Sequence, residues 1–342
     1  MKKFGTLCLV FLLLVGCAAC GGAKESGTYP EKAITLVIPY GTGGTTDLTG
    51  RQLALALEKE LGVSVTVVNK AGASGAVGTE YVLEQEADGY TLLLSADSLG
   101  TQRVMGLSDK CYGDFTCVSL VTNDPKVIVV AKDSPYQTAE DLFGAMKENP
   151  GKIKMSYTGP GGSGHVQSLI YNAMGYEMAL TAYGSGGDCI LSVIKGETDF
   201  TNSNYSTVRS YLEAGTLRIV AVSEMERLSC EPDVPALREV FPGTQKYFQV
   251  AFTPLSLQAP KDTPSAVIEA LQNACAAAFE QEEWKAYVND NALEPLYSRY
   301  VTTDEQRQFF SFWESYVSWL LYDAGAAQIS PEAFSIARPQ GM

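Results

Sequence analysis

One segment near the start of the chain constrains its fold more than any other, because it joins an apolar strand, a glycine-rich bend and a helix. The strand Ala33–Pro39 runs into Gly41, Gly43 and Gly44, which carry no Cβ and let the backbone approach a ligand closely. The helix that begins near Thr45 directs its unpaired N–H groups and the positive end of its dipole at the same place. This combination predicts an anion-binding site that needs no basic side chain.

The bend lacks the lysine of a nucleotide-binding loop. A phosphate-binding P-loop ends Gly-Lys-Ser/Thr, whereas this stretch ends Thr45-Thr46-Asp47. We therefore expect a carboxylate ligand rather than a nucleotide. A carboxylate at a helix N-terminus is itself favourable, so we expect Asp47 to support the helix, with ligand contact as the second interpretation.

The first residues indicate export. Lys2 and Lys3 precede an apolar run, Leu7–Val15, that is too short to span a bilayer. The following Leu-Val-Gly-Cys17 resembles the lipobox of bacterial lipoproteins, in which the cysteine is lipidated; Cys20 is a weaker candidate, and an ordinary cleaved signal peptide is the alternative. We expect a signal peptide and lipobox over residues 1–20, a flexible tether over 21–29, and an extracytoplasmic protein held by lipid on the outer face of a bacterial membrane.

Composition excludes several classes of partner and cofactor. Acidic residues number 39 against 25 Lys and Arg, a formal net charge of −14, which repels nucleic acid and gives no long-range attraction to an anionic ligand. Any anion specificity must then come from local dipoles. His165 is the only histidine and no zinc spacing occurs, so we expect no metal. Cys111 and Cys117 flank a turn-like stretch that a disulfide could close.

Alternation of strands and helices predicts an α/β fold with ligands at the carboxyl ends of strands. We expect two lobes, with 30–131 plus 250–342 forming lobe 1 and 132–249 forming lobe 2, and with glycine turns of both facing one cleft. The predicted strands are Ala33–Pro39, Ser64–Asn69, Tyr90–Ser95, Val127–Ala131, Lys152–Tyr157, Asp199–Tyr205, Leu217–Ser223 and a return strand within Val250–Ala259. The predicted helices are Asp47–Leu61, Val77–Glu86, Ala139–Lys147, His165–Met174, Cys189–Lys195, Pro264–Gln281, Trp284–Asn291 and Thr303–Ala324.

Several motifs in order resemble the substrate-binding receptors of tripartite tricarboxylate transporters, over roughly residues 30 to 325. These motifs are Pro39–Asp47, Val67–Gly78, Ala87–Leu94, Asn149–Ile153, Gly159–His165, Tyr183–Gly187, Asp233–Pro235 and Ala259–Pro264. The resemblance implies a periplasmic-binding-protein fold of type II (a Venus flytrap), a mixed sheet flanked by helices in each lobe, and no enzymatic activity. It also implies a monomeric receptor that closes on a small organic acid and delivers it to a two-subunit membrane permease.

Carried over by position, the resemblance assigns ligand contacts to both lobes. The expected contacts are Tyr40, Thr42, Gly43, Gly44, Asp47, Ala73 and Ser74 in the first lobe, and Thr158, Gly159, Ser163, His165, Tyr183, Gly186, Asp199 and Asn204 in the second. The chain departs from the usual family pattern in having Tyr40 for phenylalanine and Thr42 for proline. Tyr183-Gly-Ser-Gly-Gly also replaces Tyr-Lys-Gly-Gly, so that a lysine is missing beside the cleft.

Two other functions are consistent with some of these residues. His165 could act as a general base for Ser163 or Ser74 in an exported serine hydrolase, although neither serine lies in a Gly-x-Ser-x-Gly motif. Gly159–Gly164 also fits the Gly-x-Gly-x-x-Gly dinucleotide pattern, but an exported protein rarely meets a nicotinamide cofactor, so we expect no cofactor. A receptor that serves a signalling partner rather than a transporter is the third alternative.

Overall fold

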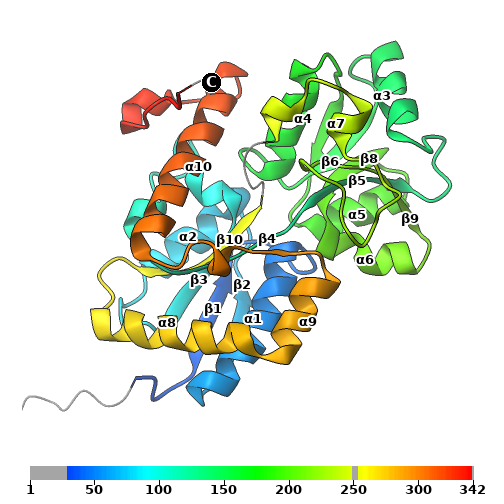
Figure 1. The fold of residues 1–342 in the computed structure, drawn as a ribbon. Coiled ribbons are helices and arrows are strands. Elements are labelled where there is room, and N and C mark those ends of the chain that lie inside the picture. Colours follow the sequence, from blue (N-terminus) through cyan, green and yellow to red (C-terminus); the bar gives the residue numbers. More distant parts are fainter. Residues whose placement is uncertain (1–28, 249–252, 341–342) are drawn as a thin grey trace, which may run out of the picture.

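A computed structural model describes residues 29–248 and 253–340, which form two β-sheets, each flanked by helices (Figure 1). The first sheet has the strand order β11-β4-β10-β3-β1-β2, and the second has the order β7-β6-β8-β5-β9. The strands are β1 (Ile34–Ile38), β2 (Val65–Asn69), β3 (Thr91–Ser95), β4 (Phe115–Asn123), β5 (Lys126–Ala131), β6 (Lys154–Tyr157), β7 (Ala179–Ala182), β8 (Phe200–Asn204), β9 (Leu217–Val222), β10 (Pro254–Pro260) and β11 (Glu294–Pro295).

The helices follow the alternation that the sequence predicts. They are α1 (Thr45–Leu61), α2 (Ala76–Leu83), α3 (Ala139–Glu148), α4 (Ser163–Ala173), α5 (Gly186–Ile194), α6 (Tyr205–Glu213), α7 (Leu237–Val240), α8 (Ser265–Glu280), α9 (Glu282–Asp290) and α10 (Thr303–Asp323). Short 3-10 turns include η1 (Ala73–Gly75) and η2 (Asp97–Gly100). The two-lobed α/β class is confirmed.

Both faces of the first sheet are buried at β1, which lies between β3 and β2, and this explains the continuous apolar run of that strand. Leu36 and Ile38 belong to the core shared with α1 and α8, whereas Val37 belongs to the core on the opposite face, with Val82 of α2 and Val317 of α10. Along β5 of the second sheet, successive apolar side chains likewise belong to two different cores. The period of two along each strand therefore supplies both helical layers with apolar contacts.

The chain passes between the lobes immediately before β5. The predicted boundary at residue 131 puts Val127–Ala131 in lobe 1, whereas β5 is hydrogen-bonded between β8 and β9 in the second sheet. We propose that the lobes meet at Asp124–Pro125, because β4 ends at Asn123 and belongs to the first sheet. The predicted return point near residue 250 lies outside the described residues.

Several sequence expectations differ from the structure. Strands β4, β7 and β11 and helices α6 and α7 were not predicted, and Cys111 and Cys117 are free thiols, so the suggested bridge is absent from the described residues. Cys111 starts a 3-10 turn and Cys117 lies within β4, which separates them along an extended strand.

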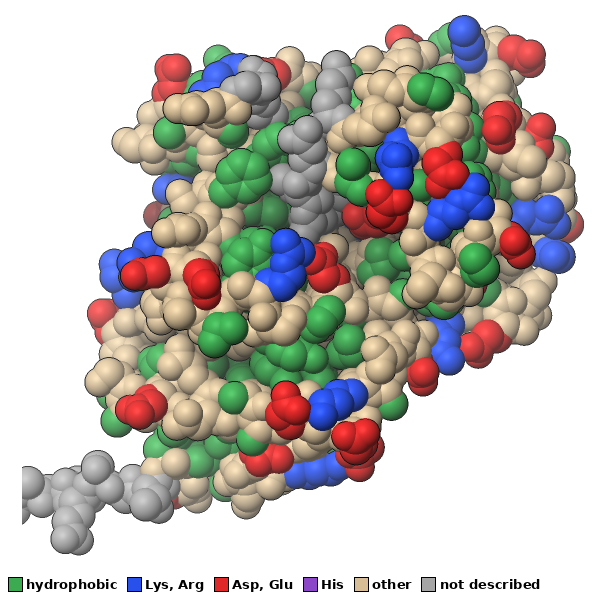
Figure 2. Space-filling view, in the orientation of Figure 1, with side chains coloured by type: hydrophobic (Ala, Val, Ile, Leu, Met, Phe, Trp, Pro, Cys, Tyr) green, Lys and Arg blue, Asp and Glu red, His purple; other side chains and the backbone are tan. Residues whose placement is uncertain are grey.

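The described residues do not test the export signal. Cys17, Cys20 and the tether up to residue 28 lie outside them. Within residues 29–248 and 253–340 no helix is long and apolar enough to cross a membrane. Figure 2 shows acidic and basic side chains side by side over one face, in keeping with surface pairs such as Arg227–Glu239.

Two glycines in helices provide a matched test of packing. A Cβ on Gly78 of α2 would lie 2.7 Å from the Pro39 Cα and 2.9 Å from the Lys70 carbonyl oxygen, whereas a Cβ on Gly144 of α3 would meet nothing within 4 Å. We expect Gly78→Ala to lower the free energy of unfolding by about 1–3 kcal/mol through overpacking. Gly144→Ala should raise it by up to about 1 kcal/mol. Guanidinium denaturation followed by circular dichroism measures both, and equal effects would contradict this account.

Candidate functional site

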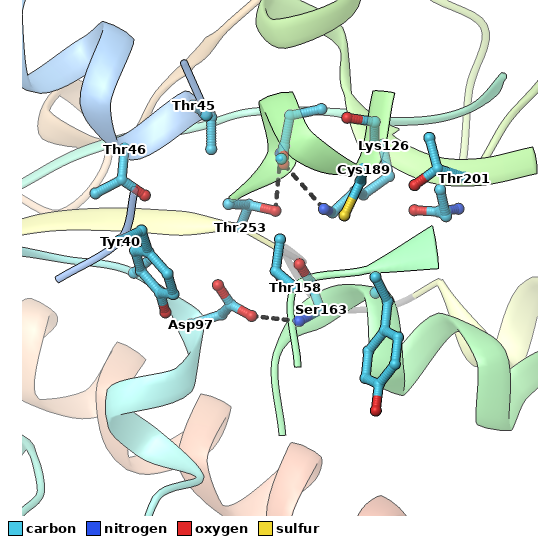
Figure 3. Close-up of a pocket in the computed structure, with 18 of the residues that line it drawn as sticks. Tyr40, Thr45, Thr46, Asp97, Lys126, Thr158, Ser163, Cys189, Thr201 and Thr253 are labelled. Atoms are coloured by element: carbon cyan, nitrogen blue, oxygen red, sulfur yellow. Dashed lines mark hydrogen bonds between the residues drawn. The ribbon is translucent and has the colours of Figure 1, made fainter. Parts of the chain in front are cut away.

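A cavity of about 50 Å³ lies between the lobes, at the N-termini of α1, α4 and α5 (Figure 3). Both lobes contribute to its walls, and most of the lining residues are polar. They are Tyr40, Gly44, Thr45, Thr46, Asp47, Ala96, Asp97, Lys126, Tyr157, Thr158, Ser163, Gly164, Gly186, Cys189, Thr201, Asn202, Ser203, Asn204 and Thr253.

Helix N-termini give this cavity a positive local potential. Helix α1 begins after Gly44 and has no side-chain cap, so its first-turn N–H groups keep their donors free of side-chain partners. Helix α4 begins after Gly162, which has no side chain to cap it, and its first N–H, that of Ser163, donates to the Asp97 carboxylate of the other lobe. Because the dipoles of both helices point into one enclosed space, an anion there is favoured even though the whole chain is acidic.

Among the residues that the structure describes, Lys126 is the only Lys or Arg that lines the cavity, and the sequence analysis missed it. It is 4% exposed, and its Nζ donates to Asn204 Oδ1 at 2.9 Å. Among the described residues no carboxylate forms a salt bridge with this ammonium group, which therefore has two further N–H donors; the charges of Asp97, Asp124 and Glu224 act on it from farther away. Burial lowers the pKa of Lys126, and the charges of Asp97 and Asp124 oppose that shift.

Asn204 fixes the lysine at the crossing between the lobes. Its Nδ2 donates to the Asp124 carbonyl oxygen and to Thr253 Oγ1, both at 2.9 Å. The antiparallel register pairs Lys126, the first residue of β5, with Asn204, the last residue of β8. The start of β5 is thus brought to the same edge as the carboxyl ends of the parallel strands, where α/β proteins bind their ligands.

Asp97 faces the cavity from the first lobe. It follows β3, is 5% exposed, and accepts a hydrogen bond from the Ser163 N–H at the start of α4 in the other lobe. Burial raises the pKa of Asp97, against the charge of Lys126 and the Ser163 N–H, which lower it. Figure 3 shows its carboxylate beside Tyr40, at the end of the cavity away from Lys126 and Thr201.

The glycine bends meet each other across the lobes. The Gly41 N–H donates to the Gly184 carbonyl at 3.3 Å, and a Cβ on Gly44 would lie only 3.3 Å from the Gly186 nitrogen. The Gly43 N–H, expected to hold the ligand, donates instead to Asp47 Oδ2 at 3.0 Å. Gly43 has a φ of 81°, which this tight bend requires. The bend therefore closes the cleft by backbone contact, and Gly44 is the part of it that lines the cavity.

Asp47 supports the bend. Its carboxylate accepts from the Gly43 N–H, from Arg51 Nη2 at 2.8 Å and from Asn69 Nδ2 at 2.9 Å. Partial burial alone would raise the pKa of Asp47, but the hydrogen bonds from Arg51, Gly43 and Asn69 hold it below its ordinary value. A carboxylate with three donors already in place is suited to shaping the site rather than to holding an anion.

A second buried carboxylate joins the lobes at their boundary. Asp124 is fully buried and accepts hydrogen bonds from Thr45 Oγ1 of α1 and Ser206 Oγ of α6. Burial raises its pKa to about 6, although the hydrogen bonds from Ser206 and Thr45 act in the opposite direction. Asp124 therefore ties the first turns of two helices from different lobes to the crossover.

The predicted ligand contacts divide into two groups. Seven of them line the cavity: Tyr40, Gly44, Asp47, Thr158, Ser163, Gly186 and Asn204. Eight are placed around it or away from it: Thr42, Gly43, Ala73, Ser74, Gly159, His165, Tyr183 and Asp199. Of the second group, Ser74 and Gly159 face each other across the lobes, since a Cβ on Gly159 would lie 2.7 Å from Ser74 Oγ.

Tyr183 and Asp199 lie on other parts of the second lobe. The Tyr183 hydroxyl donates to Glu197 Oε2 at 3.1 Å, and Asp199 accepts from the Lys154 N–H at 2.7 Å. Asp199 precedes β8, whereas the cavity lies at the other end of that strand. A motif match does not reveal at which end of β8 a residue lies, and this explains why Asp199 is among the predicted contacts but does not line the cavity.

The residues of the alternative hydrolase are not arranged for catalysis. His165 Nδ1 accepts from the Gly161 N–H at 3.1 Å, and the imidazole has no hydrogen bond to Ser163 or Ser74 among the described residues. Burial lowers the pKa of His165. Within the described ranges no group of His, Cys, Asp and Glu side chains is arranged to hold a metal.

Two of the missed residues had a signal in the sequence. Asp97 comes two residues after an apolar strand, where ligand-binding side chains gather in α/β sheets. Lys126 interrupts an otherwise apolar run after Pro125, but its place in the cavity follows only from the antiparallel pairing of β5. The polar stretch Thr201–Ser203 carried no comparable signal.

The two lobes and the enclosed polar cavity define a periplasmic-type solute-binding protein. Residues 49–309 match the model of the tripartite tricarboxylate transporter family receptor, TctC, and the chain belongs to this family. Receptors of this family are extracytoplasmic binding proteins rather than enzymes, as the resemblance implied.

Relatives and solved structures agree with this assignment. Protein BugT of Bordetella pertussis is 28% identical over 88% of this chain and 91% of its own length. A UPF0065 protein of Agrobacterium vitis is 31% identical over 75% of this chain and 74% of its own length. The periplasmic binding protein BugD shares the fold with a TM-score of 0.81 at 24% identity, covering 87% of this chain and 99% of BugD.

Removal of the carboxylate that supports the bend tests its structural role. We expect Asp47→Ala to lower the free energy of unfolding by about 1–3 kcal/mol, because buried donors lose their acceptor. The folded pKa lies below 3.8, so the contribution of the carboxylate is complete above that pH and is lost as the pH falls through the folded value. The stability gap to wild type should therefore narrow in acid. Asp133→Ala, at an exposed position, is the control and should show no gap.

Proposed function

We propose that this protein is an extracytoplasmic receptor that captures a small carboxylate-bearing organic acid between its lobes, with Lys126 as the counterion of the carboxylate. The observation that carries the proposal is an ammonium group that is 4% exposed, has no ion-pair partner in the described chain and lines the cavity. An uncompensated buried charge is costly, and a bound carboxylate removes that cost. Each hydrogen bond to the charged group contributes about 1.5–3 kcal/mol.

Ligand binding and lobe closure are coupled in this proposal. The contacts that join the lobes include the Gly41–Gly184 backbone bond, the Asp97–Ser163 bond and the bonds of Asp124 to Thr45 and Ser206. A carboxylate that touches Lys126 from one side and the N-terminus of α1 from the other has its full set of donors only when the lobes are together. The ligand would thus bind the closed form better and shift the equilibrium toward it.

The dimensions of the cavity favour a small acid. Its volume of about 50 Å³ corresponds to on the order of four water molecules. Two proteins of the same fold support a carboxylate ligand: MatC from Rhodopseudomonas palustris with bound malate, at a TM-score of 0.79 and 22% identity, and Rpa4515 with adipate, at 0.80 and 23%.

We further propose that the receptor is a monomeric lipoprotein that is anchored through Cys17 and serves a two-subunit permease. The family is named for tripartite transporters, which supports a membrane partner. The sequence Leu-Val-Gly-Cys17 and the small polar residues after it support a lipid anchor on a tether. A closed receptor would present surfaces of both lobes to the permease, so closure would report that ligand is bound.

The role of Lys126 can be tested with a charge-matched control. We expect Lys126→Met, in the full chain purified in detergent and freed of ligand by unfolding and refolding, to bind small carboxylates at least about 10-fold more weakly, since a charged hydrogen bond is lost. Lys132→Met, at an exposed position, should bind as wild type does. Isothermal calorimetry measures both.

Thermal unfolding of the same variants without ligand is the control for folding. Because the buried ammonium group has no counterion, the Lys126→Met protein should be as stable as wild type or more so. Equal affinities of wild type and Lys126→Met for every carboxylate that binds would refute the role of this lysine.

The proposed lipid anchor can be tested with two cysteine variants. When the full chain is expressed in a bacterial host, Cys17→Ala should move the protein from the membrane fraction to the soluble fraction, because the acylated residue is gone. Cys20→Ala should leave it in the membrane fraction. Mass spectrometry of the N-terminal peptide identifies the modified cysteine, and acylation at Cys20 would contradict the assignment.

A further inference from the structure

A second hollow between the lobes begins at the same crossing segment as the cavity. It is a groove of about 570 Å³, which Asn123 and Glu294 line from the first lobe and Glu224 lines from the second. Pro125 lines the groove and the next residue, Lys126, lines the cavity. The two spaces are therefore separated by a single step of the chain.

Glu224 connects this groove to the cavity through Lys126. Its Oε1 accepts from the Lys126 N–H at 2.9 Å, while the Nζ of the same lysine donates to Asn204 Oδ1 in the cavity. Glu224 and Lys126 also act on each other through their charges. A change in the charge of Glu224 therefore changes the electrostatic potential at the ammonium group that faces the ligand.

The other charged side chains that line the groove already have ion-pair partners. These pairs are Glu294–Arg299, Arg227–Glu239 and Glu226–Arg238. Tyr300 is the remaining titratable side chain that lines the groove within the described part of the chain. Among the described residues Glu224 is thus the only carboxyl group of the groove that forms no salt bridge.

The surroundings of Glu224 favour its protonated form. Burial raises the pKa of Glu224 to about 8, against the hydrogen bond from the Lys126 N–H and the charge of that lysine, which lower it. The negative charges of Glu294, across the groove, and of Asp124, at the crossing, raise the pKa further. Glu224 therefore gains or loses its proton at a pH where an ordinary glutamate is already ionised.

We propose that the protein takes up a proton at Glu224 when it binds an anionic ligand beside Lys126. This inference rests on the proposed function, because it needs a carboxylate at the lysine. Such a ligand adds a negative charge near Glu224 and makes its ionisation less favourable. The coupling is reciprocal, so protonation of Glu224 strengthens ligand binding by the same factor.

The sign of the pH dependence follows from this coupling. Below about pH 7 Glu224 is protonated both with and without ligand, so the affinity is highest and does not change with pH. As the pH rises through about 8, the ligand-free form loses its proton first and the affinity falls. Above the pKa of the ligand-bound form both forms are ionised, and the affinity is again constant at its lower value.

Calorimetric titration at several pH values tests the coupling. Full-length protein, unfolded and refolded to remove bound ligand, is titrated with propionate, succinate, malate and adipate, which are ionised throughout the range used. We expect wild type to bind about 3- to 10-fold more weakly at about pH 9.5 than at about pH 7. Glu224→Gln keeps an oxygen for the Lys126 N–H but cannot ionise. It should match wild type at the lower pH and bind more tightly than wild type at the higher pH.

Buffers with different enthalpies of ionisation count the protons that are taken up. Wild type should show net uptake near pH 8 that Glu224→Gln lacks. Glu226→Gln makes the same charge change at a side chain that is 77% exposed, and it should keep the uptake. Glu294→Gln removes a like charge from the opposite lobe and should move the alkaline fall in affinity to lower pH.

Thermal unfolding without ligand tests the protonation of Glu224 by itself. The carboxyl has an ordinary pKa of 4.5 when unfolded and one of about 8 when folded, so wild type loses stability relative to Glu224→Gln as the pH rises between these values. A constant stability difference over that range would overturn the inference, as would proton uptake that persists unchanged in Glu224→Gln. Both outcomes leave a carboxylate receptor in place. Failure of all four acids to bind would count instead against the proposed function.

Discussion

Burial of the Lys126 ammonium group, with no salt bridge to it among the described residues, is the constraint on which the interlobe site depends. Moving such a charge out of water costs several kcal/mol of desolvation free energy. One hydrogen bond to Asn204 and the charges of Asp97 and Asp124 offset only part of this cost. The helix N-termini around it make the same region more positive. In the proposed function, the carboxylate of the ligand supplies the remaining charge compensation.

The same arrangement explains how an acidic protein can hold an acid. A net charge of −14 offers no attraction at a distance, and the surface pairs its charges locally. Inside the cavity, however, a single lysine and oriented backbone dipoles act across a few ångströms in a medium with little water, where their effect is largest. Affinity is thus decided by closure rather than by the charge of the whole molecule.

Much of the fold could be predicted from the sequence, because apolar strands and glycine turns alternate with amphipathic helices from Ala33 onward. The site was harder for a specific reason. The Gly41–Gly44 bend is recognisable as a place of close backbone approach, and in the structure the Gly184–Gly187 bend of the other lobe lies against it. A glycine in a tight bend indicates that another group approaches the backbone closely. The sequence does not identify that group, whereas the structure of both lobes does. Lys126 was missed because its position depends on antiparallel pairing with β8, a strand far along the chain.

The acidic side chains around Lys126 differ in the hydrogen bonds that they already accept. Asp47 accepts hydrogen bonds from Arg51, Asn69 and the Gly43 N–H. Asp124 accepts hydrogen bonds from the hydroxyls of Thr45 and Ser206. Both carboxylates therefore stabilise the conformation of the site. Asp97 faces the cavity, where it accepts hydrogen bonds from Ser163 and from its own backbone N–H, and the charge of Lys126 acts on it. A binding site that needed only to attract anions would be stronger without it. Its presence opposite the lysine is therefore the feature that most restricts the chemistry of the ligand.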